Sequence, residues 1–167
     1  MDGTLHDRDC YTWTREQAAA LRRLAETRAN LDAALDLPNL IEAVEDLGSE
    51  QVEKVRSHLL LVLEHVLLIA HAPQSTAVNH WRGESRVFRR NALRPYRPSM
   101  RRLIEPELDG EWRVAAEAAG DKLGQALRVP AACPFTLDEL LDESLTLDAL
   151  LSRVVPTTAN REGAPDA

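Results

Sequence analysis

An apolar run of 12 residues, Leu59 to Ala70, constrains the fold of this chain more than any other feature, and only Glu64 and His65 interrupt it. The run is too short to span a bilayer, which needs about 20 apolar residues. Wound as a helix, it is apolar on nearly every side, and such helices are buried among others. We therefore predict a central helix over about residues 50–71, ended by Ala72-Pro73.

The composition favours helices around that centre. Hydrophobic residues make up 44% of the 167 residues but aromatics only 4%, so Leu, Ala and Val must fill the core. A chain of this length fits one domain. We predict an all-α, single-domain bundle of five or six helices. The first 20 residues lack the apolar stretch of a secretory signal, and we expect a cytoplasmic protein.

Local signals place the other elements. Thr14 and Gln17 form a candidate capping box for a helix to about Arg28. Asp36 is a candidate cap for a short helix to Leu47, and Gly48-Ser49 should close it and turn the chain into an antiparallel central helix. Further along the chain we expect a basic helix from about 80–81, broken by Pro95 and Pro98, and a helical stretch over 106–127. A capping box at Thr136 and Glu139 should start a short helix, and a last turn is expected within 147–154. The domain limits we expect are a flexible lead-in over 1–10, a helical domain over 11–154 and a disordered tail over 155–167.

Charge is unevenly distributed along the chain. The net charge is −7, but residues 82–102 hold eight arginines and one acid, a local charge of +7. The remaining 12 bases and 26 acids sum to −14. An acidic body thus carries one basic segment.

The basic segment supplies a candidate binding face. Its residues recur at three- and four-residue spacing from the start of the basic helix: Trp81, Arg82, Arg86, Arg89 and Arg90. Three interpretations remain open. The arginines pair with acidic helices of the same molecule or of a partner subunit, they bind nucleic-acid phosphates, or they bind an acidic protein.

A polar stripe on the central helix is the second candidate. It comprises Glu42 on the preceding helix together with His58, Glu64 and His65. With a turn at Gly48, Glu42 would lie near His58, and Asp32 and Asp36 near His65. Two interpretations are open. The histidines hydrogen-bond carboxylates at a helix interface, or they belong to a metal site. His58 and His65 lie about 10 Å apart along a helix, too far to share one ion. We therefore expect no metal or cofactor.

Motifs for catalysis are missing from the sequence. It contains no Gly-x-Ser-x-Gly, no phosphate-binding glycine loop and no Glu-x-x-His pair. Cys10 and Cys133 have no CxxC partner, which favours two reduced thiols over a disulfide. We name no catalytic residue, and a metal-dependent enzyme is the least favoured interpretation.

Three segments resemble the DUF29 family of uncharacterised bacterial helical proteins. They are Tyr11-Thr-Trp-Thr-Arg-Glu-Gln-Ala18, the stretch from Asp36 through Gly48-Ser49 to His65, and Cys133-Pro-Phe-Thr136 before a leucine-rich turn. The resemblance covers about residues 9–145. The chain departs from the family pattern at the basic helix, where Ser85 follows Trp81 at the position of an isoleucine and Pro95 interrupts.

The resemblance implies a helical fold. The family has no established activity that could be assigned to this chain. The resemblance also implies an antitoxin-like role beside a small toxin. We expect a non-enzymatic interaction or regulatory protein, an antitoxin-like partner of a small basic protein, whose acidic surface complements that partner. A protein partner or self-association is the favoured interpretation. A nucleic-acid-binding module using Arg82 to Arg102 is the alternative, and no membrane contact is expected.

Overall fold

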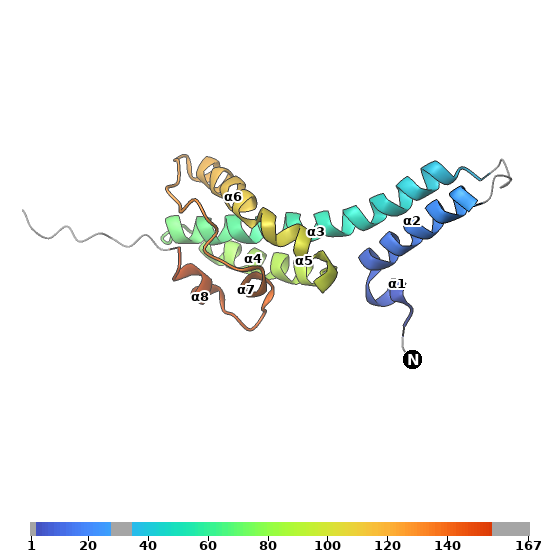
Figure 1. The fold of residues 1–167 in the computed structure, drawn as a ribbon. Helices are drawn as coiled ribbons and strands as arrows, with labels where there is room; N and C mark the ends of the chain where they lie inside the picture. The colour runs from blue at the N-terminus through green and yellow to red at the C-terminus, as the bar shows by residue number, and fades with distance from the viewer. Residues whose placement is uncertain (1–2, 28–34, 155–167) are drawn as a thin grey trace, which may run out of the picture.

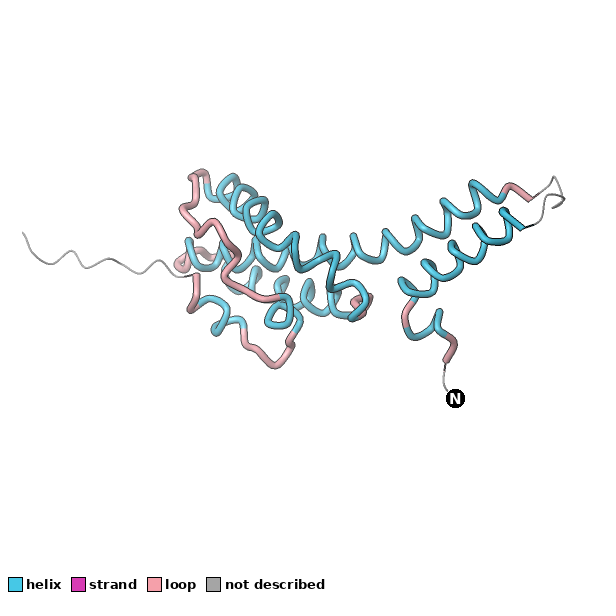
Figure 2. The backbone as a smooth tube through the Cα atoms, in the orientation of Figure 1, coloured by secondary structure: helices cyan, strands magenta, loops and turns pink. Residues whose placement is uncertain are grey.

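The computed structural model describes residues 3–27 and 35–154, and within these ranges the chain is all-α, without a strand (Figures 1 and 2). This confirms the all-α single-domain prediction. The elements, in chain order, are α1 (Leu5–Arg8), α2 (Cys10–Thr27), α3 (Leu37–His71), α4 (Val78–Leu93), η1 (Pro98–Met100), α5 (Arg101–Ile104), η2 (Glu105–Glu107), α6 (Leu108–Leu123), α7 (Leu137–Leu141) and α8 (Leu147–Leu151).

The axis of the molecule is α3, a single helix of 35 residues and about 52 Å. As predicted, Asp36 caps it, its carboxylate accepting from the Asn39 N–H, and Ala72 ends it. The predicted break at Gly48-Ser49 is wrong. Helix α3 runs straight through both residues, and the Ser49 hydroxyl donates to the Glu45 carbonyl at 3.1 Å.

Gly48 is a packing residue and not a helix stop. The one positive φ among the described residues belongs to Gly124, which ends α6. A Cβ on Gly48 would overlap Thr14 Oγ1, so the missing side chain lets α2 approach α3 closely. The predicted cap at Thr14 is wrong as well: Thr14 lies inside α2 and donates to the Tyr11 carbonyl, while the Asp9 carboxylate accepts from the Thr12 N–H near the helix start.

Helix α2 and the first half of α3 form an antiparallel arm, which we define as residues 10–27 and 37–51 (Figure 1). The buried residues of α2, Tyr11, Thr14 and Ala18, all lie in the half near the bundle. From 19 to 27 and from 38 to 47 the arm buries no side chain fully. The arm therefore depends on its base for stability.

The second half of α3 is the centre of the hydrophobic core. Leu59, Leu63 and Leu67 have no exposed surface. Helices α4, α6 and α8 pack against α3, and α7 adds its leucines to the same core (Figure 1). Trp112 of α6 is fully buried, with its ring edge-to-face with Phe135 and its N–H donating to the Pro130 carbonyl at 2.9 Å. Residues 50–71 are thus central to the core, as predicted, but they are the second half of α3 and not a separate helix.

Several predicted boundaries agree with the structure. Helix α4 ends at Leu93, before Pro95, and Thr136 and Glu139 form the capping box of α7. Where a flexible lead-in was predicted, residues 5–8 form α1, whose cap Thr4 hydrogen-bonds Asp7. The predicted tail over 155–167 lies outside the described residues. Across the ranges that the structure describes, no helix combines the length and apolarity needed to cross a membrane.

Candidate functional site

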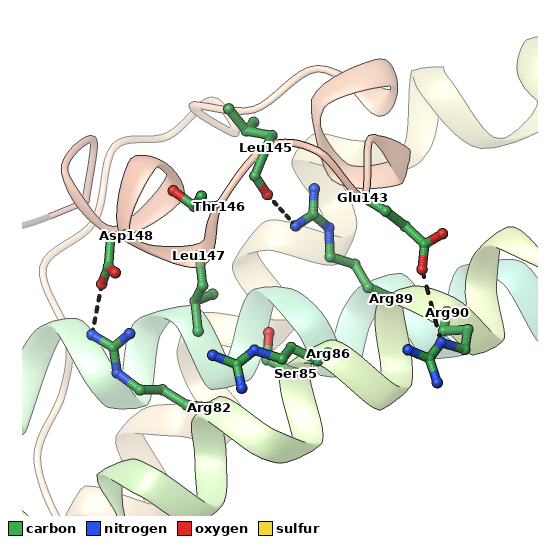
Figure 3. Close-up of a pocket in the computed structure, with 10 residues that line it drawn as sticks. All are labelled: Arg82, Ser85, Arg86, Arg89, Arg90, Glu143, Leu145, Thr146, Leu147 and Asp148. Carbon is green, nitrogen blue, oxygen red and sulfur yellow. Dashed lines mark hydrogen bonds and ion pairs between the residues drawn. The ribbon is translucent and has the colours of Figure 1, made fainter.

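The arginines of α4 face the α7–α8 segment across a narrow gap (Figure 3). Arg82, Arg86, Arg89 and Arg90 lie along the helix in the order expected from their spacing. Trp81, predicted to lie beside them on an open face, is instead half-buried and packs against the core. The face therefore borders an intramolecular junction.

Arg89 holds this junction together. Its guanidinium is buried, and Nε donates to the Leu140 carbonyl at 2.9 Å while Nη1 donates to the Leu145 carbonyl at 2.6 Å. Nη2 donates to the carbonyls of Glu139 and Asp142. Burial lowers the pKa of Arg89 from its usual value. Its place in the predicted binding face is corrected: the side chain serves four backbone acceptors and is not available to a macromolecular partner.

Two further arginines pair with acids at the ends of the junction. Arg82 Nη2 lies 2.7 Å from Asp148 Oδ1, and this contact lowers the pKa of the Asp148 carboxyl. Arg90 Nε is 3.9 Å from Glu143 Oε1, a weak and exposed pair. Between them, Arg86 is exposed and has no hydrogen bond or ion pair within the described part of the chain.

A pocket of about 380 Å³ lies between these elements, and we call it the α4–α8 cleft. Ser85 is 1% exposed, and its hydroxyl has no hydrogen-bond partner among the described residues. Figure 3 shows its oxygen pointing from α4 toward the opposite segment. The cleft is lined by Arg82, Ser85, Arg86, Arg89, Arg90, Glu143, Leu145, Thr146, Leu147 and Asp148.

The later arginines of the basic segment also contact the protein itself. Arg97 donates to the Arg8 carbonyl at 2.6 Å, which ties α1 to the end of α4. Arg101 pairs with Asp138 and with Glu105. Intramolecular contacts thus occupy much of the segment, as the first of the three interpretations expects.

The polar stripe on α3 is divided among separate contacts. His65 is buried; Nδ1 donates to the Leu61 carbonyl at 2.8 Å and Nε2 lies 2.9 Å from Glu84 Oε2. This hydrogen bond is the main cause of a lowered pKa for Glu84, which His80 also contacts at 3.2 Å. The expected proximity of His65 to Asp36 is wrong because α3 is continuous. Asp32 lies outside the described residues.

The other members of the stripe lie apart as well. His58 contacts the carbonyl of Lys54 at 2.7 Å, and buried Glu64 lies 2.5 Å from Lys122 Nζ. Glu42 is on the same helix as His58, about 24 Å away along the axis, so the predicted proximity is wrong. Over residues 3–27 and 35–154, no group of three metal-ligating side chains comes together.

A feature that sequence reasoning missed is a row of acids on the arm, which we call the acidic row: Glu42, Asp46, Glu50 and Glu53. All four are exposed on one side of α3. Within the described chain, the first three form no ion pair. Glu53 pairs with Arg56 at 3.6 Å and accepts a hydrogen bond from the Ser57 hydroxyl at 3.5 Å. The row was not recognised in the sequence because the predicted turn at Gly48 assigned its members to two separate helices.

The acidic row runs toward a groove of about 620 Å³ at the base of the arm, the arm groove. Its apolar part includes Leu103, which is 41% exposed, above Val52 and Tyr11. The groove is lined by Tyr11, Arg15, Glu45, Ser49, Val52, Glu53, Arg56, Leu103 and Glu107. The groove thus combines apolar side chains with three acids and two arginines, of which Arg56 is paired with Glu111 at 2.6 Å. Apolar surface beside exposed acids suits an amphipathic basic segment.

These features define an all-α protein with a long central helix and a projecting arm. Residues 5–146 match the family described as "Domain of unknown function DUF29", and the chain belongs to this family. It is also similar to a crystal structure from Rhodospirillum rubrum ATCC 11170, described as an alpha-helical protein of unknown function. The two share 26% identity with a TM-score of 0.83, over 93% of this chain and 100% of the other. A search of curated proteins found no match.

Proposed function

We propose that this protein is a non-enzymatic interaction protein whose arm binds a basic, amphipathic segment of another protein. The segment would lie along the acidic row and place apolar side chains in the arm groove. The observation that carries this proposal is the row of exposed acids, three of them without an ion pair in the described chain, that leads into a groove with an exposed leucine.

The acidic row is electrostatically unfavourable for the protein alone. Glu42, Asp46 and Glu50 are spaced four residues apart, and like charges at that spacing each cost a few tenths of a kcal/mol in a helix. Between 37 and 54, α3 carries five acids and a single lysine, and a sixth acid, Asp36, caps it. A partner with arginine or lysine at matching spacing removes this repulsion and is steered toward the arm by the field.

A second copy of the chain fits this surface less well than a basic partner. The acidic row would then face either another acidic row or the basic segment of the partner copy. In that segment Arg82, Arg89, Arg97 and Arg101 are already engaged in internal contacts. Charge complementarity therefore favours a different, basic protein.

This interpretation accommodates the antitoxin-like role that the family resemblance implied and the cytoplasmic location expected from the sequence. A small basic protein would be held, and its own basic surface covered, by the arm. The same internal contacts of the arginines count against nucleic-acid binding by the basic segment. The scattered contacts of the polar stripe likewise give no support to a metal-dependent enzyme.

The test is a titration with a labelled synthetic helical peptide of arginine and leucine, followed by fluorescence anisotropy. We expect saturable binding that weakens as salt rises from about 50 to 200 mM. The Asp46→Lys/Glu50→Lys variant should bind about tenfold more weakly, a loss of about 1.4 kcal/mol.

The matched control is Glu117→Lys/Asp121→Lys, which reverses two exposed acids at the same spacing on α6. It changes the net charge equally but leaves the arm intact. Equal losses in both variants would mean that only net charge is sensed, and they would reject the arm as the binding surface. A labelled DNA duplex that binds better than the peptide would favour the nucleic-acid alternative.

A further inference from the structure

We propose that the α4–α8 cleft is a binding site for a small anionic compound, whose carboxylate or phosphate group is held by the Arg86 guanidinium and the Ser85 hydroxyl. This site lies on the bundle, away from the arm, and does not depend on the proposed protein partner (Figures 1 and 3).

Ser85 provides the first observation. Its hydroxyl is buried, lines the cleft, and lacks a hydrogen-bond partner among the described residues. A buried polar group without a partner is costly, and native proteins retain few of them. An oxyanion accepts hydrogen bonds from a hydroxyl, so such a ligand would satisfy this group.

Arg86 provides the second observation. It lies between two paired arginines, since Asp148 engages Arg82 at one end of the cleft and Glu143 approaches Arg90 at the other (Figure 3). Both acids form their ion pairs at the ends of the cleft, although Asp148 also attracts Arg86 electrostatically, and the four arginines outnumber the two acids in the lining. A guanidinium presents its donors in a fork that matches a carboxylate or phosphate.

A third favourable feature is the rigid wall of the cleft that faces α4, formed by the backbone of residues 139–145. Arg89, one turn along α4, fixes the 139–145 backbone through four carbonyls, so the wall opposite the helix is held in place. A site whose walls are fixed before binding loses less conformational entropy when the ligand arrives.

The size and lining of the cleft define the class of ligand. A volume of about 380 Å³ lies at the lower end of the range for small-molecule sites. Leu145 and Leu147 offer apolar contact opposite the arginines. A small carboxylic acid or phosphate ester with a short apolar part fits this combination. Extended nucleic acid fits less well, because it would need a row of available cations.

The test is a nuclear magnetic resonance titration of the full chain with inorganic phosphate, and separately with acetate, at constant ionic strength. Backbone amides and arginine Nε–H groups are the probes. We expect saturable shifts at Ser85 and Arg86 with a millimolar or tighter dissociation constant for at least one anion. The two titrations distinguish a phosphate ligand from a carboxylate ligand.

Three variants make the test specific. Arg86→Gln should weaken binding about tenfold or more, and Ser85→Ala several-fold. Arg94→Gln removes an exposed arginine at the end of the same helix, outside the cleft, and should leave the affinity unchanged. Shifts that do not saturate, or that spread equally over Arg94 and Arg102 and persist in Arg86→Gln, would overturn the proposal. Preferential binding of a short oligonucleotide across those arginines would overturn it too.

Discussion

Gly48 of α3 lies directly against the Thr14 side chain of α2, and this contact sets the distance between the two helices of the arm. Both residues are buried, and the Thr14 hydroxyl is satisfied by the Tyr11 carbonyl within its own helix. A glycine that resembles a helix stop in the sequence is therefore a point where the two helices of the arm pack against each other.

Gly48→Ala should destabilise the protein. Alanine favours a helix over glycine by about 1 kcal/mol, but overpacking against Thr14 costs about 1–3 kcal/mol. The control is Gly83→Ala in α4, where a Cβ would meet nothing within 4 Å. Only the stabilisation from the higher helix propensity of alanine should remain there. Urea unfolding of both variants measures the difference, and a Gly48→Ala protein as stable as Gly83→Ala would refute the packing role.

The central helix was predictable because its signal is local. A run apolar on nearly every side, followed by Ala72-Pro73, leaves few structures other than a buried helix. The capping boxes illustrate the limit of such signals. The box at Thr136 and Glu139 is real, whereas that at Thr14 and Gln17 matches the same pattern inside a helix.

The continuity of α3 could have been predicted from the spacing of its apolar residues. Ile41, Val44, Gly48, Val52 and Val55 keep the three- and four-residue spacing across Gly48, so the buried side does not change there. A turn at Gly48 would have interrupted this regular spacing of apolar residues. The error at Gly48 then carried over to the polar stripe, because every proposed proximity of Glu42 and His58 depended on it.

The role of Arg89 was beyond sequence reasoning. Its partners are backbone carbonyls of residues 139–145, about 50 positions away, and carbonyls have no sequence signature. Nothing in the spacing of Arg86, Arg89 and Arg90 indicates which of them is buried. The same holds for the α4–α8 cleft, which exists only where α8 packs beside α4.

Arg89→Ala should be strongly destabilising. It removes the guanidinium donor from four carbonyls, although the Asp142 carbonyl keeps the Leu145 N–H as a second donor. We expect a loss of about 3 kcal/mol or more in the free energy of unfolding. Arg89→Lys should recover only part, because an ammonium cannot reach all four acceptors in the same geometry. Arg94→Ala, on the exposed end of α4, should stay within about 0.5 kcal/mol of the unmodified protein. Thermal unfolding followed by circular dichroism compares them, and similar midpoints for all three would contradict the assignment.

Ser85→Ala should stabilise the protein by about 1 kcal/mol while it weakens anion binding. The buried hydroxyl is unpaired among the described residues, so its removal eliminates a desolvation cost without removing a hydrogen bond. The opposite signs of the two effects distinguish a binding group from a structural one. A destabilised Ser85→Ala variant, measured by urea unfolding, would show that the hydroxyl supports the fold.

Acid should weaken the α7 region through Glu139. Hydrogen bonds from Arg153 and from the Thr136 backbone lower the pKa of Glu139 from 4.5 to about 2. A group with a lowered pKa in the folded state stabilises it above its unfolded pKa, and loses that contribution as pH falls through the folded value. The stability difference between the unmodified protein and Glu139→Gln should be constant above pH 5 and shrink between 4.5 and 2. A difference independent of pH over this range would contradict the Glu139–Arg153 pair.

The acidic side of the arm, as we propose, binds a basic protein. The most direct measurement is a low-salt affinity purification from the native cell with three tagged proteins: the unmodified chain, Asp46→Lys/Glu50→Lys and Glu117→Lys/Asp121→Lys. We expect one stoichiometric basic protein, with little absorbance at 260 nm, to be retained by the unmodified chain and the α6 variant and lost from the arm variant. Retention of the same partner by the arm variant, or recovery of nucleic acid in its place, would contradict the claim.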